Sequence, residues 1–300
     1  MKSIKKIILS LILAPTLLVG CNDLLDVNSE RTASPDEYTL GAANDTLYSM
    51  FSVFGQLQKL AQNYVFLGEL RGDLMDLTDK SDLYLKQINN FEVSSDNPYT
   101  KIKDYYAVIN NCNYIIQKLD TNRVVGAQKV MLKEYAACKA IRAWTYMQIA
   151  LNYGSAIYYD KAILSVADAQ SVQSQPAKSL EELAPILIND LLPYKDVPNP
   201  NLGLLFGYST SYSYFPVRFV LGDLYLWTGQ YENAAQEYYD LINKNSITMS
   251  SIFSASWEVV NNAFTGVFNI YNSGYLGDYP YSQMTNIGAT NQYGQNFQLD

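Results

Sequence analysis

Residues 219–242 read FVLGDLYLWTGQYENAAQEYYDLI, and this stretch decides the fold. It contains two segments with the three- and four-residue apolar spacing of amphipathic helices, separated at Gly229. Gly222 and Ala234 are small enough for two antiparallel helices to approach closely, and Gly229 can adopt the backbone conformation that the turn between them requires. The stretch therefore predicts a tightly packed helix pair.

The offsets within this stretch are those of the tetratricopeptide (TPR) pattern. The matching residues are Leu221, Gly222, Tyr225, Gly229, Tyr231, Ala234 and Tyr238. We expect the three tyrosines among them to pack between helices. Because a single repeat cannot bury its apolar face alone, the pair must stack on further helices.

Helical periodicity occurs in several other parts of the chain, and the fold class that it predicts is mostly α, a TPR-like helical-repeat scaffold. The predicted helices cover 36–64, 100–119, 127–153, 180–194, 216–228 and 231–243. Gly154 is expected to be a left-handed C-cap. Ser179 and Glu182 have the spacing of a capping box, and Pro185 is expected to kink its helix or delay its start.

The last part of the chain lacks the helical periodicity of the preceding segments. Residues 250–271 contain alternating and β-branched runs, which predict a short β-hairpin. Residues 272–300 are rich in Gly, Asn and Gln with little periodicity, and we expect a loop-rich segment there.

Composition excludes several functional classes. The 300-residue chain has a net charge of −8, which becomes −8 − 3 = −11 if Lys2, Lys5 and Lys6 are removed with a signal peptide, and this argues against nucleic-acid binding. It has no histidine, so it lacks imidazole bases and imidazole metal ligands. Its 26 tyrosines, against 11 Phe and 3 Trp, suit half-wet surfaces that grip carbohydrate or peptide.

The first twenty residues, MKSIKKIILSLILAPTLLVG, have a basic start and a short apolar run. This run is shorter than the ~20 residues that span a bilayer, so we predict a signal peptide over 1–20. Leu-Val-Gly-Cys at 18–21 resembles a bacterial lipobox, which predicts lipidation at Cys21 and a membrane anchor. The polar stretch 21–35 is interpreted as a tether to one domain over 36–300. Cys112 and Cys138 are expected to be unbridged core thiols.

Several motifs in order resemble the SusD/RagB family of outer-membrane nutrient-binding lipoproteins. They are the lipobox followed by CNDLLD, YYAVINNCN at 105–113, IRAWTY at 141–146 with LNYG at 151–154, SLEEL at 179–183 with NDL at 189–191, and the helix pair. The resemblance implies a lipid-anchored protein at the cell surface that captures a glycan or other nutrient and works with a SusC-like TonB-dependent transporter. Family members run well past 300 residues, so we expect a truncated or short member that covers mainly the N-terminal half.

The candidate ligand-binding residues are of two kinds. Aromatic residues in or beside irregular segments can stack on sugar faces, while Arg71 and Asp73 lie where the resemblance implies polar ligand contacts. The aromatic candidates are Tyr99, Tyr271, Tyr275, Tyr279 and Tyr281. Packing against the scaffold is the alternative for each tyrosine, and a surface salt bridge is the alternative for Arg71 and Asp73.

We expect no catalytic residues and no cofactor. Asp73, Asp76, Asp79 and Asp82 recur every three residues, but they lack the ligand order of a calcium loop. We therefore rank structural calcium near Asp73, Asp76 and Asp79 below a solvated, self-repelling loop. No two acids stand out as a glycosidase pair. Two functions remain, a nutrient-binding lipoprotein and a TPR-type lipoprotein that acts only as a protein–protein scaffold.

Overall fold

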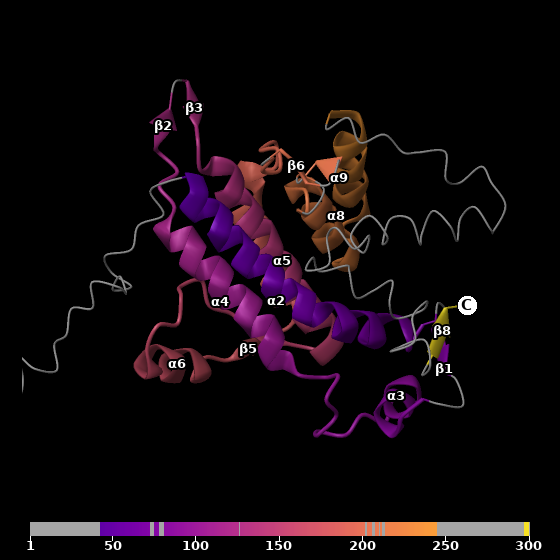
Figure 1. Ribbon diagram of the computed structural model, residues 1–300. Helices are drawn as coiled ribbons and strands as arrows, with labels where there is room; N and C mark the ends of the chain where they lie inside the picture. Colours follow the sequence, from indigo (N-terminus) through magenta and orange to yellow (C-terminus); the bar gives the residue numbers. More distant parts are fainter. Residues whose placement is uncertain are drawn as a thin grey trace, which may run out of the picture. The chain divides into compact units, whose positions relative to one another are not determined.

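The computed structural model describes residues 43–72, 75–77, 81–125, 127–201, 203–205, 208–209, 211, 214–244 and 297–299. These residues are mostly helical, with short antiparallel strand pairs between the helices (Figure 1). In chain order the elements are α2 (Ala43–Glu69), β1 (Met75–Leu77), α3 (Leu83–Asn89), α4 (Ile102–Lys118), β2 (Val124–Val125), β3 (Gln128–Lys129), α5 (Leu132–Tyr153), β4 (Ala156–Ile157), α6 (Val166–Gln173), β5 (Ala177–Lys178), α7 (Leu180–Leu191), the 3₁₀ turn η2 (Leu192–Tyr194), β6 (Leu204–Leu205), β7 (Tyr208–Ser209), α8 (Val217–Trp227), α9 (Tyr231–Lys244) and β8 (Phe297–Leu299).

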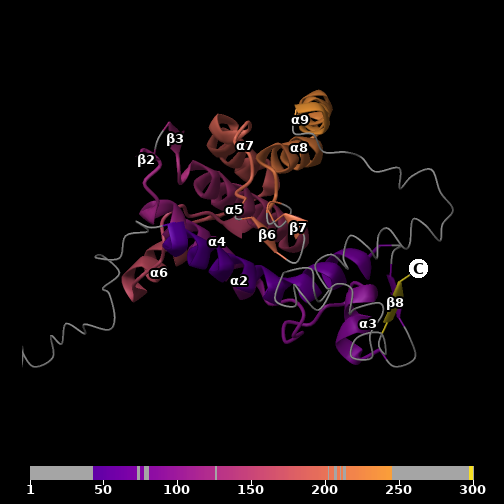
Figure 2. The same ribbon diagram turned by 45° about the horizontal axis from the view of Figure 1, so that its top comes forward.

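Helix α5 is the centre of the helical body. Every residue from Ala136 to Ala150 is buried, because α2, α4, α7 and α8 all contact this helix (Figures 1 and 2). Near its start, the Cys138 thiol lies 3.4 Å from the Met50 sulfur of α2, and near its end Asn152 bonds Arg71, just beyond α2. Helices α2 and α5 therefore run in the same direction. Cys112 and Cys138 are both buried and unbridged, as predicted.

The α8–α9 pair confirms the packing predicted from its glycines. A Cβ atom added at Gly222 would lie 2.4 Å from the Tyr238 ring, and Gly229 has φ +74° in the turn. Ala234 is buried, and the Tyr238 hydroxyl donates to the Asp223 carboxylate at 2.5 Å. The prediction for Tyr231 is wrong, because this side chain is 68% exposed. It stands at the start of α9, where no described helix covers it.

A buried arginine also ties this pair to the preceding helix. Arg218 on α8 is fully buried, and its guanidinium pairs with Glu237 and Asp240 of α9, the latter at 3.1 Å. It also donates to Asp196, just after η2, at 2.5 Å. These ion pairs fix α9 and the end of α7 against α8, since a buried cation without partners would be costly.

Several predicted boundaries are confirmed and two are wrong. The helix expected to end at 64 continues to Glu69 as α2. The helices expected over 100–119, 216–228 and 231–243 are present as α4, α8 and α9, and Gly154 caps α5 with φ +85°. The helix expected from 127 begins only at Leu132, because the preceding residues form the β2–β3 hairpin, in which Val124 pairs with Lys129. β-branched residues at this position favour the strand.

Helix α7 begins at Leu180, as the capping signal predicts. The Glu182 carboxylate accepts a hydrogen bond from the Ser179 backbone N–H at 2.9 Å. The helix continues through Pro185, so of the two effects that we expected from this proline, a kink or a delayed start, the delayed start is wrong. Helices α3 and α6 were not predicted. Both are short and carry their own caps, the Asp82 carboxylate for α3 and Ser165 with Asp168 for α6.

Strand β1 pairs with β8, which brings Met75 opposite Leu299. The hairpin expected over 250–271 and most of the expected loop-rich segment lie outside the described residues, as does the whole of 1–42. None of the helices that the structure describes is both long enough and apolar enough to cross a bilayer.

Candidate functional site

Of the predicted site residues, Arg71 and Tyr99 lie within the described structure. Cys21, Asp73, Tyr271, Tyr275, Tyr279 and Tyr281 lie outside it.

Arg71 follows the C-terminal end of α2 and is partly exposed. Its Nε donates to the Leu67 carbonyl, and its Nη2 donates to the Asn152 side-chain carbonyl on α5. It therefore connects the ends of the two parallel helices. Both partners are neutral oxygens, so none of the contacts described pairs the Arg71 guanidinium with a carboxylate.

Tyr99 is held firmly against the helical body. Its ring packs edge-on against Phe66 with a centroid distance of 4.9 Å, and its hydroxyl donates to the Asp82 carboxylate at 2.9 Å. Asn97 fixes the loop before it, donating to the Tyr84 carbonyl at 3.0 Å. These contacts match the alternative that Tyr99 packs against the scaffold, although its side chain is only partly buried.

Two tyrosines that the sequence did not single out lie beside Arg71. Tyr105 on α4 and Tyr153 at the end of α5 have ring centroids 5.9 Å apart at 77°. Both hydroxyl oxygens are buried without a hydrogen-bond partner among the described residues. Burial raises the pKa of Tyr153 to about 12 and that of Tyr105 still further, while the nearby charge of Arg71 opposes both shifts.

These residues gather around the C-terminal end of α2. Tyr64, Tyr99 and Tyr153 all pack against the core cluster formed by the last turns of α2, Met75 and α3. We define the α2 corner as Tyr64, Arg71, Tyr99, Tyr105, Asn152 and Tyr153. It combines aromatic rings, tyrosine hydroxyls, an amide and a cation, the groups that bind a hydroxyl-rich ligand.

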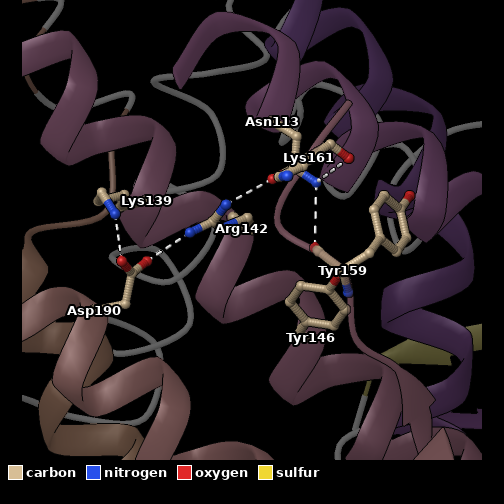
Figure 3. A network of polar contacts seen from close by, with 7 residues as sticks. All are labelled: Asn113, Lys139, Arg142, Tyr146, Tyr159, Lys161 and Asp190. Atoms are coloured by element: carbon tan, nitrogen blue, oxygen red, sulfur yellow. Dashed lines mark hydrogen bonds and ion pairs between the residues drawn. The ribbon is translucent and has the colours of Figure 1, made fainter. Parts of the chain in front are cut away.

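A second polar cluster is buried between α4, α5 and α7 (Figure 3). Asp190 of α7 accepts from Lys139 and from Arg142 Nη2, the latter at 2.6 Å. Arg142 Nη1 donates to the Asn113 side-chain carbonyl at 2.6 Å, and the Asn113 amide donates to the Tyr159 carbonyl at 3.2 Å.

The same cluster fixes the chain that leaves α5. The Tyr146 hydroxyl donates to the Tyr159 carbonyl at 2.7 Å and accepts from the Tyr159 N–H at 3.0 Å. Among the residues drawn in Figure 3, Arg142 Nε is the only buried polar side-chain atom that has no hydrogen-bond partner in the described structure. Because these side chains satisfy one another, the cluster is a structural latch between helices.

The latch explains what the sequence motifs encode. Asn113, Arg142 and Asp190 come from three of the segments that resemble SusD/RagB, and they meet in one network. Those motifs therefore specify the helical framework. Sequence periodicity alone missed the latch, because charged residues such as Lys139 and Arg142 give no apolar signal, although every residue of α5 from Ala136 to Ala150 is buried.

Two of the four evenly spaced acids lie in the described structure, and they have separate positions. Asp82 is the N-cap of α3, accepting from the Leu85 N–H at 2.8 Å, and Asp76 is exposed on β1. Asp73 and Asp79 lie outside the described residues. Within the part of the chain that the structure describes, no three carboxylates or thiols are grouped as metal ligands.

Comparison with solved structures identifies the fold. A SusD superfamily protein from Bacteroides vulgatus is 18% identical with a TM-score of 0.54, and the match covers 69% of this chain and 44% of that one. NanU of B. fragilis is 17% identical with a TM-score of 0.57, covering 75% and 46%. A laminarin-binding SusD-like protein is 13% identical with a TM-score of 0.53, covering 69% and 44%. No protein-family profile and no curated protein matches the sequence.

The chain therefore has the SusD-like, TPR-type helical fold, as the sequence motifs predicted. It spans less than half the length of these solved structures.

Proposed function

We propose that this protein binds a nutrient at the cell surface and delivers it to a SusC-like TonB-dependent transporter. The nutrient class that we propose is an oligosaccharide. The observation that carries the proposal is the shared fold with SusD-like proteins, one of which binds laminarin. The lipobox at Cys21 supports outer-membrane anchoring after removal of residues 1–20, with 21–35 as tether and 36–300 as the binding domain.

The α2 corner is the described part of the proposed binding surface. Arg71 offers a cation whose partners are neutral, and the Tyr105 and Tyr153 hydroxyls are unpaired within the described residues. Tyr105 is fully buried, so it supports the corner from within. Tyr153 is only partly buried, and because buried polar groups normally find partners, its unpaired hydroxyl is one that a ligand or water can satisfy. Asp73, Tyr271, Tyr275, Tyr279 and Tyr281 complete the proposed site as further polar and aromatic contacts.

Sugar rings stack on tyrosine faces, and their hydroxyls exchange hydrogen bonds with amides, guanidinium groups and phenols. Such surfaces are wet, so we expect dissociation constants on the order of micromolar to millimolar, or roughly −4 to −8 kcal/mol. We propose binding without catalysis, since the chain has no histidine and no two acids stand out as a glycosidase pair.

An affinity-gel screen of the full chain against a glycan panel tests nutrient binding. Wild type should bind at least one glycan, and Tyr275→Ala and Tyr279→Ala should each weaken that binding. Tyr239→Ala is the matched control, because Tyr239 is 64% exposed on α9 and is not among the proposed site residues. Equal binding by wild type and both site variants would contradict the assignment of these two tyrosines.

One observation favours the scaffold alternative. Leu226, Trp227 and Tyr231 surround the α8–α9 turn and are 45%, 59% and 68% exposed. Exposed aromatic residues of this kind are typical of protein interfaces. A chain that captures a partner protein through Trp227 but retains no glycan of the panel would support the scaffold function over nutrient binding.

A further inference from the structure

The β2–β3 hairpin stands apart from the helices. It connects the end of α4 to the start of α5 and projects beyond them in both views (Figures 1 and 2). Its two strands pair through Val124 with Lys129 and Val125 with Gln128, and the Val130 N–H donates to the Arg123 carbonyl at 3.2 Å. A two-stranded hairpin is marginally stable in water when nothing covers its faces.

The exposed side chains of this hairpin are apolar to an unusual degree. Val124 is 54% exposed, Val125 is 60% exposed and Val130 is 39% exposed. Directly opposed residues of an antiparallel pair lie on the same face, so Val124 and Val125 stand on opposite faces of the hairpin. Neither face is covered by a described element, and both expose valine.

The charge of the hairpin is opposite to that of the chain. Residues 121–133 contain Arg123, Lys129 and Lys133 and no acidic residue, with Asp120 and Glu134 at their two ends, whereas the whole chain has a net charge of −8. All three basic side chains are exposed. Exposed valines bordered by cations match the interface of an anionic bilayer, which accepts apolar side chains and attracts basic ones.

The hairpin also lies at the end of the helical body from which the chain leads back to Cys21. The contact of Met50 with Cys138 places the start of α2 beside the start of α5. From Ala43 to Cys21 there are 43 − 21 = 22 residues. An extended chain of that length spans at most about 70–80 Å, which lets the hairpin reach a bilayer in which Cys21 is anchored.

We propose that the β2–β3 hairpin is a second membrane contact, which inserts Val124 and Val125 among anionic lipid headgroups while Arg123 and Lys129 bind the phosphates. The contact orients the helical body on the bilayer, because it adds a second attachment point to the lipid anchor. The hairpin contact rests on the proposed lipidation, because the lipid brings the chain to the membrane. The experiment below tests the hairpin contact and the lipid anchor separately.

The test places an environment-sensitive nitrobenzoxadiazole dye on Val125→Cys in the full chain, bound to phosphatidylglycerol-containing vesicles. Cys112 and Cys138 are buried, so the new thiol is the reactive one. Val166→Cys is the matched control, since Val166 is 75% exposed at the start of α6. Unsubstituted chain should take up no dye, and uptake there would mean that Cys21 is free and that the lipid anchor is wrong.

The hairpin dye should shift to the blue and be quenched by brominated acyl chains, and the dye at 166 should do neither. Lys129→Glu should reverse most of the blue shift, as should replacing phosphatidylglycerol by phosphatidylcholine. If the chain floats with vesicles but the dye at 125 behaves like the dye at 166, the hairpin contact is wrong while the lipid anchor stands. Quenching that is equal in neutral vesicles would contradict the role of the basic residues.

Discussion

Gly222→Ala is the smallest change that tests the packing of the α8–α9 pair. The added methyl carbon would lie 2.4, 2.7 and 2.8 Å from three atoms of the Tyr238 ring. Ordinary contact begins near 3.4 Å, so the ring must move by about 1 Å. Movement also disturbs the hydrogen bond from the Tyr238 hydroxyl to Asp223, which is 2.5 Å long.

The expected change in the free energy of unfolding combines two destabilising effects and one stabilising effect. Overpacking a close contact costs about 1–3 kcal/mol, and weakening a hydrogen bond to a carboxylate adds about 1 kcal/mol. Replacing glycine by alanine within a helix contributes about 0.5–1 kcal/mol in the other direction. We therefore expect Gly222→Ala to lower the free energy of unfolding by about 1–3 kcal/mol.

Urea denaturation of the full chain, followed by circular dichroism, measures this change. Gly55→Ala in α2 is the matched control, because no atom lies within 4 Å of the added carbon, and it should stabilise by about 0.5–1 kcal/mol. In a Tyr238→Ala background Gly222→Ala should also become stabilising, which a double-mutant cycle detects. If Gly222→Ala stabilises as much as Gly55→Ala in the wild-type background, the close helix crossing is wrong.

Three further predictions use the same measurement. Arg142→Met should cost about 1–3 kcal/mol, because Asn113 loses its donor and Asp190 keeps only Lys139, and a loss below about 0.5 kcal/mol would contradict the latch. Tyr146→Phe should cost about 1–3 kcal/mol, since its hydroxyl makes two hydrogen bonds, whereas Tyr105→Phe should change stability by less than about 0.5 kcal/mol. The contribution of Tyr153 to stability should be constant below pH 10 and be lost as the pH rises from 10 to about 12, because the unfolded chain loses the Tyr153 proton first. Tyr153→Phe should make the fall over this range shallower, and the raised pKa values of Tyr105 and Tyr146 should keep part of it.

The helices that could be predicted are those whose signals are local. Apolar periodicity, the turn at Gly229 and the carboxylate of Glu182 act within one or two helical turns, so α4, α7, α8 and α9 are visible in the sequence. The β2–β3 hairpin was missed because strands of two residues are too short for a period to emerge.

The contacts that join distant segments could not be predicted. Arg142 and Asp190 are 48 positions apart, and nothing local marks either one as buried. Tyr231 shows the opposite error, because it was predicted to be packed and is exposed. Its position in the TPR pattern gives a buried side chain only where another helix covers it. Tyr105 and Tyr153 stand in the sequence only as parts of the motifs that resemble SusD/RagB. Their unpaired hydroxyls could not be predicted, because periodicity indicates that a ring is buried but not whether its oxygen has a partner.

A calorimetric titration of the full chain with a glycan retained in the affinity screen tests the central claim, that the α2 corner binds saccharide. Arg71→Met should weaken binding at least about tenfold, or roughly 1.4 kcal/mol. Arg123→Met, which removes an exposed arginine from the β2–β3 hairpin, should leave the affinity unchanged. The account is contradicted if wild type binds no glycan, or if Arg71→Met binds as tightly as Arg123→Met.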